Sequence, residues 1–451
     1  MAAVVLAGVA AAPVANAETL ADALVAAYRN SNLLDQNRAV LRAADEDVAQ
    51  ALSSLRPVVQ FTALGGWRKA ELDTALGVIT TEGLSSSLLV SAQLTLFDFG
   101  RNELGIAIAK ESVLATRQAL IDVEQQVLLA AVQAYVDVRR AEEVVSLQQA
   151  NFRLLTEELG AAQDRFDVGE ITRTDVAIAE SRLAQSRAGL ASAEGQLMVA
   201  RESYKAAIGA YPGKLAGVPS APKLPRTLAE AQSVALKTHP ILLQAQHLVA
   251  IAERQVDFAK ADLLPTIGAQ ASVSRDNDGL DEQTVGIELN QTLYAGGRLS
   301  SVYRQALAGK DRASAELQQT AVLIAQGVGV SWANLEISAA SIEATTQQVE
   351  AARTAFVGVR EEAAVGARTT LDVLDAEQEL LDARNAQLEA IAQKYIAIYQ
   401  VLSSLGLLTV DHLQLGIPTY DPEAYYDAVK NAPSTSPQGK KLDRILKKIG
   451  N

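Results

Sequence analysis

Two long stretches of the chain repeat apolar residues at every seventh position. In the first stretch, one such row is Ile106, Val113, Leu120, Val127 and Ala134. In the second stretch, the matching row is Val328, Leu335, Ile342, Val349 and Phe356. No proline occurs between Pro57 and Pro212, or between Pro265 and Pro418. A sustained heptad repeat without proline predicts very long helices wound together as coiled coils.

Four shorter segments alternate apolar and polar residues at period two, over residues 59–68, 84–96, 266–274 and 284–293. The clearest of them has Leu84, Leu88, Val90, Ala92, Leu94 and Leu96 on one face. Its other face has Ser85, Ser87, Ser91, Gln93 and Thr95. This pattern predicts four β-strands of about ten residues each. The polar stretches 69–83 and 275–283 are expected to be loops within the two strand pairs.

The two halves of the chain repeat each other. Residues 19–23, Thr-Leu-Ala-Asp-Ala, return as Thr-Leu-Ala-Glu-Ala at 227–231. Val-Gly followed by Thr and Asp, at 168–175, returns at 365–372. Such self-similarity indicates one structural unit built twice. We therefore expect the order helix, two strands, very long helix, turn and long helix, twice over, with Gly169 and Gly366 supplying the turn conformation.

Two environments fit the alternating strands. A soluble sheet with one wet face has the same pattern as a strand pair in a membrane. The Ser/Thr/Gln-rich faces suit a water-filled lumen, and this context favours the membrane. Four strands cannot close a barrel, and an open edge in lipid leaves backbone groups unpaired. A membrane location therefore requires several copies of the chain to share one barrel.

Composition excludes several kinds of site and partner. The 451-residue chain contains no cysteine, which excludes disulfides, thiol nucleophiles and cysteine metal sites. Its formal charge of −13 argues against nucleic acid as a partner. Residues 1–17 are apolar and end in Ala-Asn-Ala, which predicts a secretory signal peptide, although a buried N-terminal helix is the alternative.

Short motifs lie where the second strand of each pair leads into a long helix: Leu-Thr-Leu-Phe-Asp-Phe-Gly-Arg at 94–101 and Leu-Tyr-Ala-Gly-Gly-Arg at 293–298. Together with the two turns and the duplication, they resemble the TolC family of outer-membrane channel-tunnels. The resemblance implies a homotrimer with a twelve-stranded β-barrel, four strands per chain, in the outer membrane. It also implies a long α-helical barrel across the periplasm, which makes the fold an α+β membrane protein.

The predicted signal peptide, the duplication and the resemblance together divide the chain into segments. The signal peptide is 1–17, the first repeat 18–208 and the second repeat 227–406. Residues 209–226, rich in proline, and 407–430 are expected to wrap the middle of the tunnel as an equatorial belt. Residues 431–451 form a polar tail that is expected to be mobile.

Asp372 and Asp375 match the family segment whose two aspartates line the periplasmic constriction. Their spacing of three places both on one helix face, so the resemblance implies two stacked carboxylate rings in a trimer. Such rings titrate as coupled sets and favour cations. The alternative is that they are solvated acids in the first turn of a helix, stabilised by the helix dipole.

The resemblance further implies a latch that holds the tunnel closed. Arg368 matches an arginine bonded near a threonine–aspartate pair on the neighbouring hairpin, here Thr174 and Asp175. Ala363 stands where one family member has a tyrosine that bonds to that aspartate, so half of the latch is missing. We expect the closed state to be held more weakly or by other contacts.

The two turns are the expected docking sites for a periplasmic adaptor. Their residues are Val168, Gly169, Glu170, Val365, Gly366 and Ala367. The alternative is that the exposed valines only staple each turn.

Little else in the sequence suggests chemistry. His239, His247 and His412 lack metal-site spacing, and we find no nucleophile, base or cofactor motif. We therefore expect no enzyme, metal or cofactor. The predicted function is a passive outer-membrane exit duct of a tripartite efflux pump or type I secretion system, opened by an adaptor and an inner-membrane transporter of RND or ABC type. The alternative is a periplasmic coiled-coil scaffold without channel activity.

Overall fold

The computed structural model describes residues 17–75, 77–277, 279, 281–430, 437, 440, 441 and 444. The expected signal peptide lies outside these residues except for Ala17, and so does nearly all of the polar tail 431–451. Both expectations therefore stay predictions.

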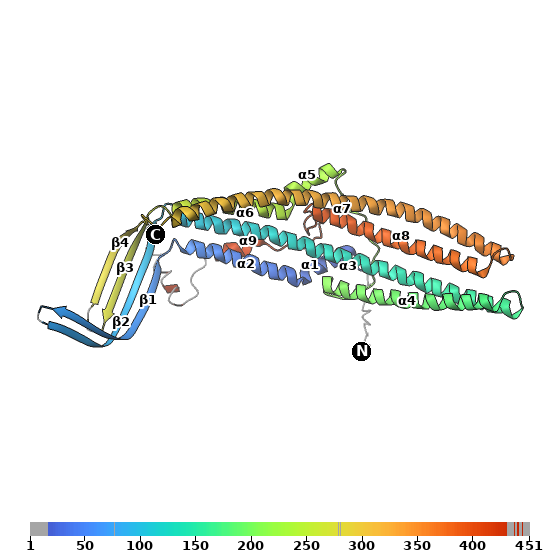
Figure 1. Ribbon diagram of the computed structural model, residues 1–451, viewed down its shortest axis with the longest axis horizontal. Coiled ribbons are helices and arrows are strands. Elements are labelled where there is room, and N and C mark those ends of the chain that lie inside the picture. Colours follow the sequence, from blue (N-terminus) through green and yellow to red (C-terminus); the bar gives the residue numbers. More distant parts are fainter. Residues whose placement is uncertain are drawn as a thin grey trace, which may run out of the picture. The chain divides into compact units, whose positions relative to one another are not determined.

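The described elements are nine helices and four strands (Figure 1). In chain order they are α1 (Leu20–Asn30), α2 (Asn32–Ser53), β1 (Val58–Thr74), β2 (Gly77–Phe97), α3 (Arg101–Asp167), α4 (Arg173–Ile208), α5 (Leu228–Thr238), α6 (Pro240–Ala261), β3 (Thr266–Asp276), β4 (Asp281–Asn290), α7 (Arg298–Ala364), α8 (Thr370–Ser404) and α9 (Pro422–Val429).

The duplication is confirmed by the order of these elements. Helices α1 and α2, the pair β1–β2, and helices α3 and α4 are followed by α5, α6, β3–β4, α7 and α8 in the same sequence. The long helices α3 and α7 both have 67 residues, which corresponds to about 100 Å at 1.5 Å per residue. The heptad rows without proline predicted these two helices correctly.

The chain forms two compact units. Unit 1 consists of residues up to Asp35 with 121–239 and 323–419, and unit 2 consists of residues 36–120, 240–322 and 420 onward. Unit 1 has a core of large side chains that includes Tyr135, Tyr204 and Leu402. In unit 2, Leu41, Val48 and Val113 form a buried cluster against which Tyr420 and Tyr426 pack.

Three helices begin with the same local structure. Thr19, Thr172 and Thr369 each accept a hydrogen bond from a backbone N–H three residues later, where an aspartate in turn binds the backbone of the threonine. This reciprocal capping box satisfies two backbone donors that have no partner within the helix. It sets the starts of α1, α4 and α8.

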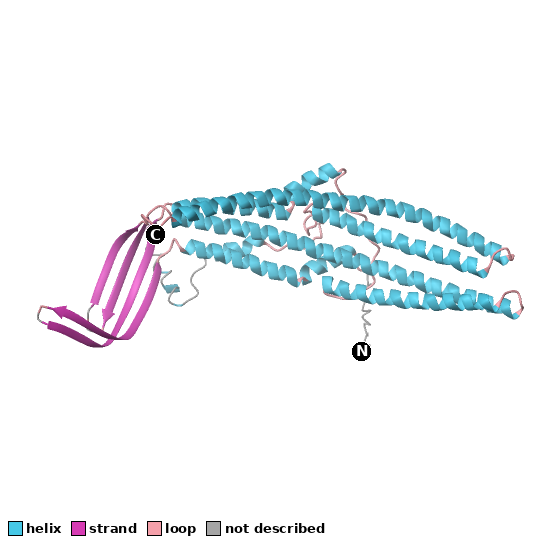
Figure 2. Ribbon diagram, in the orientation of Figure 1, coloured by secondary structure: helices cyan, strands magenta, loops and turns pink. Residues whose placement is uncertain are grey.

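The four strands, drawn in magenta in Figure 2, form one antiparallel sheet in the order β1-β2-β3-β4. The β2–β3 ladder runs from Ser87, paired with Asp276, to Phe97, paired with Ile267, with an irregularity between Thr95 and Phe97. The whole of α3 to α6 lies between these two strands in sequence. The sheet therefore joins the two repeats directly.

The predicted strand lengths were wrong for the first hairpin. Strands β1 and β2 have 17 and 21 residues, and most of the expected loop 69–83 is paired. The β-branched residues Val78, Ile79 and Thr80 favour the extended backbone. The backbone of Lys69 lies opposite that of Glu82, while the side chain of Lys69 forms an ion pair with Glu71 of the same strand at 3.3 Å.

In the second hairpin, strand β4 ends earlier than predicted. Strand β4 stops at Asn290, so Leu293, expected within the strand, lies beyond it and is 88% exposed. The loop predicted at 275–283 is shorter, because β3 continues to Asp276 and β4 begins at Asp281. A bidentate ion pair between Arg275 and Asp281 joins the two strands at this end.

No helix in the described part of the chain combines the length and the apolar character needed to span a bilayer.

Candidate functional site: the sheet faces and the helical turns

One face of the sheet is apolar and exposed. Phe61 in β1 pairs with Val90 in β2, which pairs with Val273 in β3. Their exposed fractions are 67%, 46% and 52%. Directly paired residues in an antiparallel sheet share a face, so these three side chains form one apolar row across three strands.

The same face continues onto β4. Ala271 and Ala269 in β3 pair with Val285 and Ile287, which are 87% and 75% exposed. An apolar surface spread over four strands and left uncovered by the described residues is unusual for a soluble protein. The pattern is the one expected of strands whose outer face contacts hydrocarbon.

The opposite face of the sheet is polar. Gln60, Ser91, Ser272 and Thr284 are paired in turn and form a row across all four strands. Successive residues along each strand therefore lie on opposite faces of the sheet, one apolar and the other rich in hydroxyl and amide groups. This separation agrees with the lipid and lumen sides predicted from the sequence.

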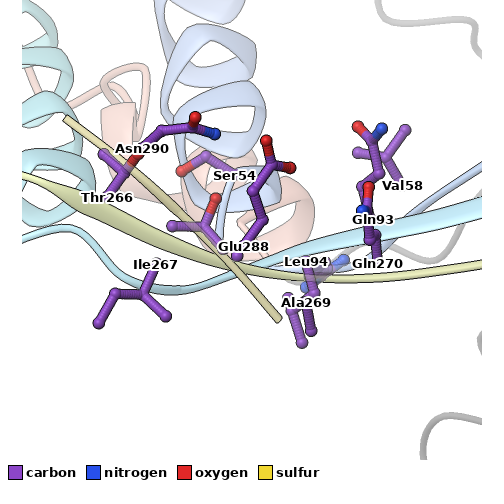
Figure 3. Close-up of a pocket in the computed structure, with 13 residues that line it drawn as sticks. Ser54, Val58, Gln93, Leu94, Thr266, Ile267, Ala269, Gln270, Glu288 and Asn290 are labelled. Atoms are coloured by element: carbon purple, nitrogen blue, oxygen red, sulfur yellow. The ribbon is translucent and has the colours of Figure 1, made fainter. Parts of the chain in front are cut away.

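A cavity of about 300 Å³ lies where the sheet meets the end of α2. Its lining includes Ser54, Arg56, Gln93, Gln270 and Glu288. Figure 3 shows the side chains of Ser54 and Glu288 on one side of the sheet and that of Ile267 on the other. The lining is polar and open, and it lacks any grouping that would catalyse a reaction. It therefore fits a part of the sheet surface that is in contact with water.

The two helical turns have the same geometry. Gly169 and Gly366 both have a φ of 80°, which residues with a side chain adopt only at a cost. The amides of Glu170 and Ala367 each bond to a carbonyl five residues earlier, those of Arg165 and Glu362, at 2.9 Å. These are Schellman-type ends, so the prediction that the two glycines supply the turn is confirmed.

Both turns present an exposed valine. The exposed fractions of Val168 and Val365 are 73% and 81%. Gly169, Glu170, Gly366 and Ala367 are exposed as well. The residues predicted to dock an adaptor are therefore accessible in the chain, and their docking role stays a prediction.

Asp372 is held at the start of α8. Its Oδ2 accepts hydrogen bonds from the backbone N–H and the hydroxyl of Thr369, at 2.9 and 2.8 Å. These bonds, the backbone bond foremost, hold the pKa of the Asp372 carboxyl below its ordinary value. The local geometry is that of the helix-cap alternative, and the role of Asp372 at a constriction stays a prediction.

Asp375 has a partner that the sequence did not suggest. Its Oδ1 lies 2.5 Å from Nη2 of Arg182, a residue of α4 that is 193 positions away. The ion pair therefore joins the first helical hairpin, made of α3 and α4, to the second, made of α7 and α8. Asp375 and Asp372 lie one turn apart on α8 but have different partners.

The residues of the predicted latch are divided among other contacts within the described part of the chain. Nε of Arg368 binds Oε2 of Glu362 at 2.8 Å, inside its own turn. Asp175 binds the hydroxyl of Thr172 at 2.7 Å, which lowers the pKa of its carboxyl. The contact of Arg368 with Thr174 and Asp175 on a neighbouring hairpin stays a prediction.

Glu377 is a buried carboxyl that the sequence analysis missed. It is 5% exposed, and neither of its oxygens has a hydrogen-bond partner among the described residues. Burial, with a smaller contribution from Glu158, raises its pKa to about 7. The group lies two residues after Asp375, close to the predicted constriction.

The described residues contain no group of three or more histidine, aspartate or glutamate side chains placed to hold a metal ion.

The comparisons with known proteins agree with one another. The family model described as outer membrane efflux protein matches residues 23–210 and 232–407. The chain is 35% identical over 421 residues to the outer membrane efflux protein BepC of Brucella suis, covering 92% of this chain and 91% of that protein. It is 26% identical over 423 residues to the outer membrane protein TolC of Escherichia coli, covering 87% and 84%.

A solved structure supports the fold separately. The chain superposes on a crystal structure of CusC with a TM-score of 0.76, at 18% identity, over 86% of this chain and 91% of that one. At this identity the likeness concerns the fold alone.

Proposed function

The chain belongs to the outer membrane efflux protein family, and we propose that it is the passive exit duct of a tripartite efflux pump or type I secretion system. It is an outer-membrane channel that extends into the periplasm, as the resemblance implied, and not an enzyme. The scaffold alternative therefore falls. Family members form trimers and work with adaptors and inner-membrane transporters.

The observation that carries the proposal is the two-faced sheet. Its apolar row Phe61–Val90–Val273 is exposed in the single chain, and the polar row beginning at Gln60 lies on the other side. Burying the apolar row in hydrocarbon is favourable by about 25 cal/mol per Å². The polar row then faces water inside a barrel.

Oligomerisation follows from the sheet edges. Strands β1 and β4 are the outer strands of the sheet in the chain. An unpaired edge in lipid costs several kcal/mol for each free backbone group. We propose that three copies pair β1 of one chain with β4 of the next and close a barrel of twelve strands.

A row of exposed apolar residues on α7 supports the same assembly. Leu323, Val330 and Ile337 are spaced by seven residues and are 54%, 56% and 65% exposed. An uncovered heptad row on a long helix suits packing against another helix. We propose that this row packs against a neighbouring copy in the helical barrel.

At the periplasmic end, we propose that Asp372 and Asp375 line the constriction. The two turns, with Val168 and Val365 at their tips, would then dock an adaptor. The adaptor and an inner-membrane transporter of RND or ABC type would open the duct and supply its energy. The proposed segment boundaries 209–226 and 407–430 give the belt around the middle of the tunnel.

A planar-bilayer recording tests the proposed duct. The purified protein is expected to insert from detergent and conduct ions with cation preference, because carboxylates favour cations. The double variant Asp372→Ala/Asp375→Ala is expected to lose much of that preference. A protein that forms stable trimers and never conducts would contradict the proposal.

Docking at the turns calls for a separate experiment. A photocrosslinker at Gly366 is expected to capture an adaptor in cells, whereas one at Gly358, inside α7, is not. A functional pump without any crosslink from Gly169 or Gly366 would contradict the docking assignment.

A further inference from the structure

Two ion pairs connect the first helical hairpin of unit 1 with the second. Nη2 of Arg182, in α4, binds Asp375, and Nη1 of Arg140, in α3, binds Glu389 at 2.8 Å. Both carboxylates belong to α8 and both guanidinium groups to the first hairpin. The two pairs are fourteen residues apart on α8, or about 21 Å.

The ion pair between Arg182 and Asp375 changes the charge near the proposed constriction. Asp372 is already bound within its own helix cap through Thr369. Asp375 is bound by a cation from the other hairpin, with side-chain exposures of 28% for Arg182 and 56% for Asp375. Asp372 also interacts electrostatically with Arg368, whose direct ion pair is with Glu362. Of the two neighbouring carboxylates, Asp375 is the one with a direct ion pair among the described residues.

We propose that Arg182 is the counter-ion of Asp375 and sets both the charge and the resting width of the constriction. The proposal rests on the assignment of Asp372 and Asp375 to that constriction. In a trimer, three guanidinium groups would offset half of the carboxylates. The ion pair also holds α4 to α8, a contact between hairpins that must change if the tips move apart.

This role would compensate for Ala363. The resemblance led us to expect a weaker closed state, or one held by other contacts. Arg182 supplies one such contact within a single chain, because it binds Asp375, a residue 193 positions away on another helix. The guanidinium plane suits a carboxylate partner better than a lysine ammonium does.

Arg140 provides a matched control. Its ion pair with Glu389 has similar exposure, 33% and 47%, and joins the same two hairpins. It lies four helical turns from Asp375 along α8, so removing it leaves the charge near the constriction unchanged. Arg140→Gln therefore separates a loss of hairpin contact from a change of charge at the constriction.

The test is ion selectivity of purified trimers in planar bilayers. Arg182→Gln is expected to raise the potassium-to-chloride permeability ratio about twofold to fivefold, and to raise conductance. Arg182→Lys is expected to keep the ratio near that of the wild type, and so is Arg140→Gln. Asp375→Asn is expected to lower the ratio, and Arg182→Gln added to it is expected to cause little further change.

Failure of the proposal can be told from failure of the proposed constriction. If Asp375→Asn lowers the ratio and Arg182→Gln leaves it unchanged, the counter-ion role is wrong and the constriction stands. If neither variant changes the ratio, both assignments are wrong. If Arg140→Gln raises the ratio as much as Arg182→Gln, the effect comes from loosened hairpins, and the charge role is rejected.

Discussion

The hydroxyl of Tyr204 donates a 2.6 Å hydrogen bond to Oε1 of Glu18, a residue 186 positions earlier in the chain. Tyr204 is fully buried, and burial together with the bond to Glu18 raises the pKa of its hydroxyl. The other carboxylate oxygen of Glu18 accepts from the backbone N–H of Gly213 at 3.2 Å. The start of the first repeat is thereby tied to the end of α4 and to the linker that follows.

Tyr204→Phe should destabilise the protein. The change leaves the carboxylate of Glu18 without its hydroxyl donor, and a hydrogen bond to a charged group contributes about 1.5–3 kcal/mol. The melting temperature of the detergent-solubilised trimer measures the loss. Tyr211→Phe is the control, because Tyr211 also binds a glutamate, Glu202, but is 55% exposed. Equal melting temperatures for both variants would contradict a structural role for the buried bond.

Gly366→Ala should loosen the second helical turn. A residue with a Cβ in the left-handed conformation costs about 1–2 kcal/mol, and Gly366 has a φ of 80°. Hydrogen–deuterium exchange should therefore be faster in the turn of the variant. Gly358→Ala should slow exchange or leave it unchanged, because Gly358 lies inside α7 with open space around it. Slower exchange in Gly366→Ala would refute the assigned strain.

Glu377 should make the stability of the protein depend on pH. Because folding raises the pKa of Glu377 from 4.5 to about 7, the native state holds the proton more tightly than the unfolded state. Its stabilising effect is full below pH 4.5 and is lost as pH rises to about 7, a change of up to about 3 kcal/mol. Glu158 is the charged group that opposes its ionisation.

Melting temperatures between pH 5 and pH 8 measure this effect. Relative to the wild type, Glu377→Gln should gain stability as pH rises, since the variant has no carboxyl to ionise. Glu379→Gln, two residues along on the exposed side of α8, should show no such trend. Parallel pH profiles for wild type and Glu377→Gln would contradict the burial of an ionisable group at this position.

The two faces of β4 should tolerate charge differently. Ile287→Lys places a cation on the apolar face, where Ile287 is 75% exposed, at a cost of about 2–4 kcal/mol if the site is near the bilayer midplane. Glu288→Lys changes the neighbouring residue on the polar face, which water would reach. Outer-membrane yield of trimer should fall for the first variant only. Equal yields would argue against hydrocarbon around this strand.

The fold was largely predictable because its signals are local and periodic. Heptad rows such as the one from Val328 to Phe356 specified α7, and alternation specified all four strands. Strand ends were harder, because pairing extends wherever a partner continues. Residues 69–83 are an example: their polar composition suggests a loop, whereas most of them have a partner in the β1–β2 ladder.

The candidate site was less predictable, because its contacts link distant positions. Nothing near Arg182 in the sequence points to Asp375. Glu377, in contrast, left a signal: it stands four residues after Val373 and four before Leu381, both buried, so it occupies a core position of α8. A charged residue in an apolar helical row marks a buried ionisable group.

Depth-dependent quenching by brominated lipids tests most directly whether one sheet face contacts hydrocarbon. Phe61→Trp and Gln60→Trp, each in a chain whose Trp67 and Trp332 are replaced by phenylalanine, put one reporter on each face of β1. In reconstituted vesicles, lipids brominated along the acyl chain should quench Phe61→Trp strongly and leave Gln60→Trp nearly unquenched. Equal quenching of the two variants, or quenching of Gln60→Trp alone, would contradict a barrel with its apolar face in the membrane.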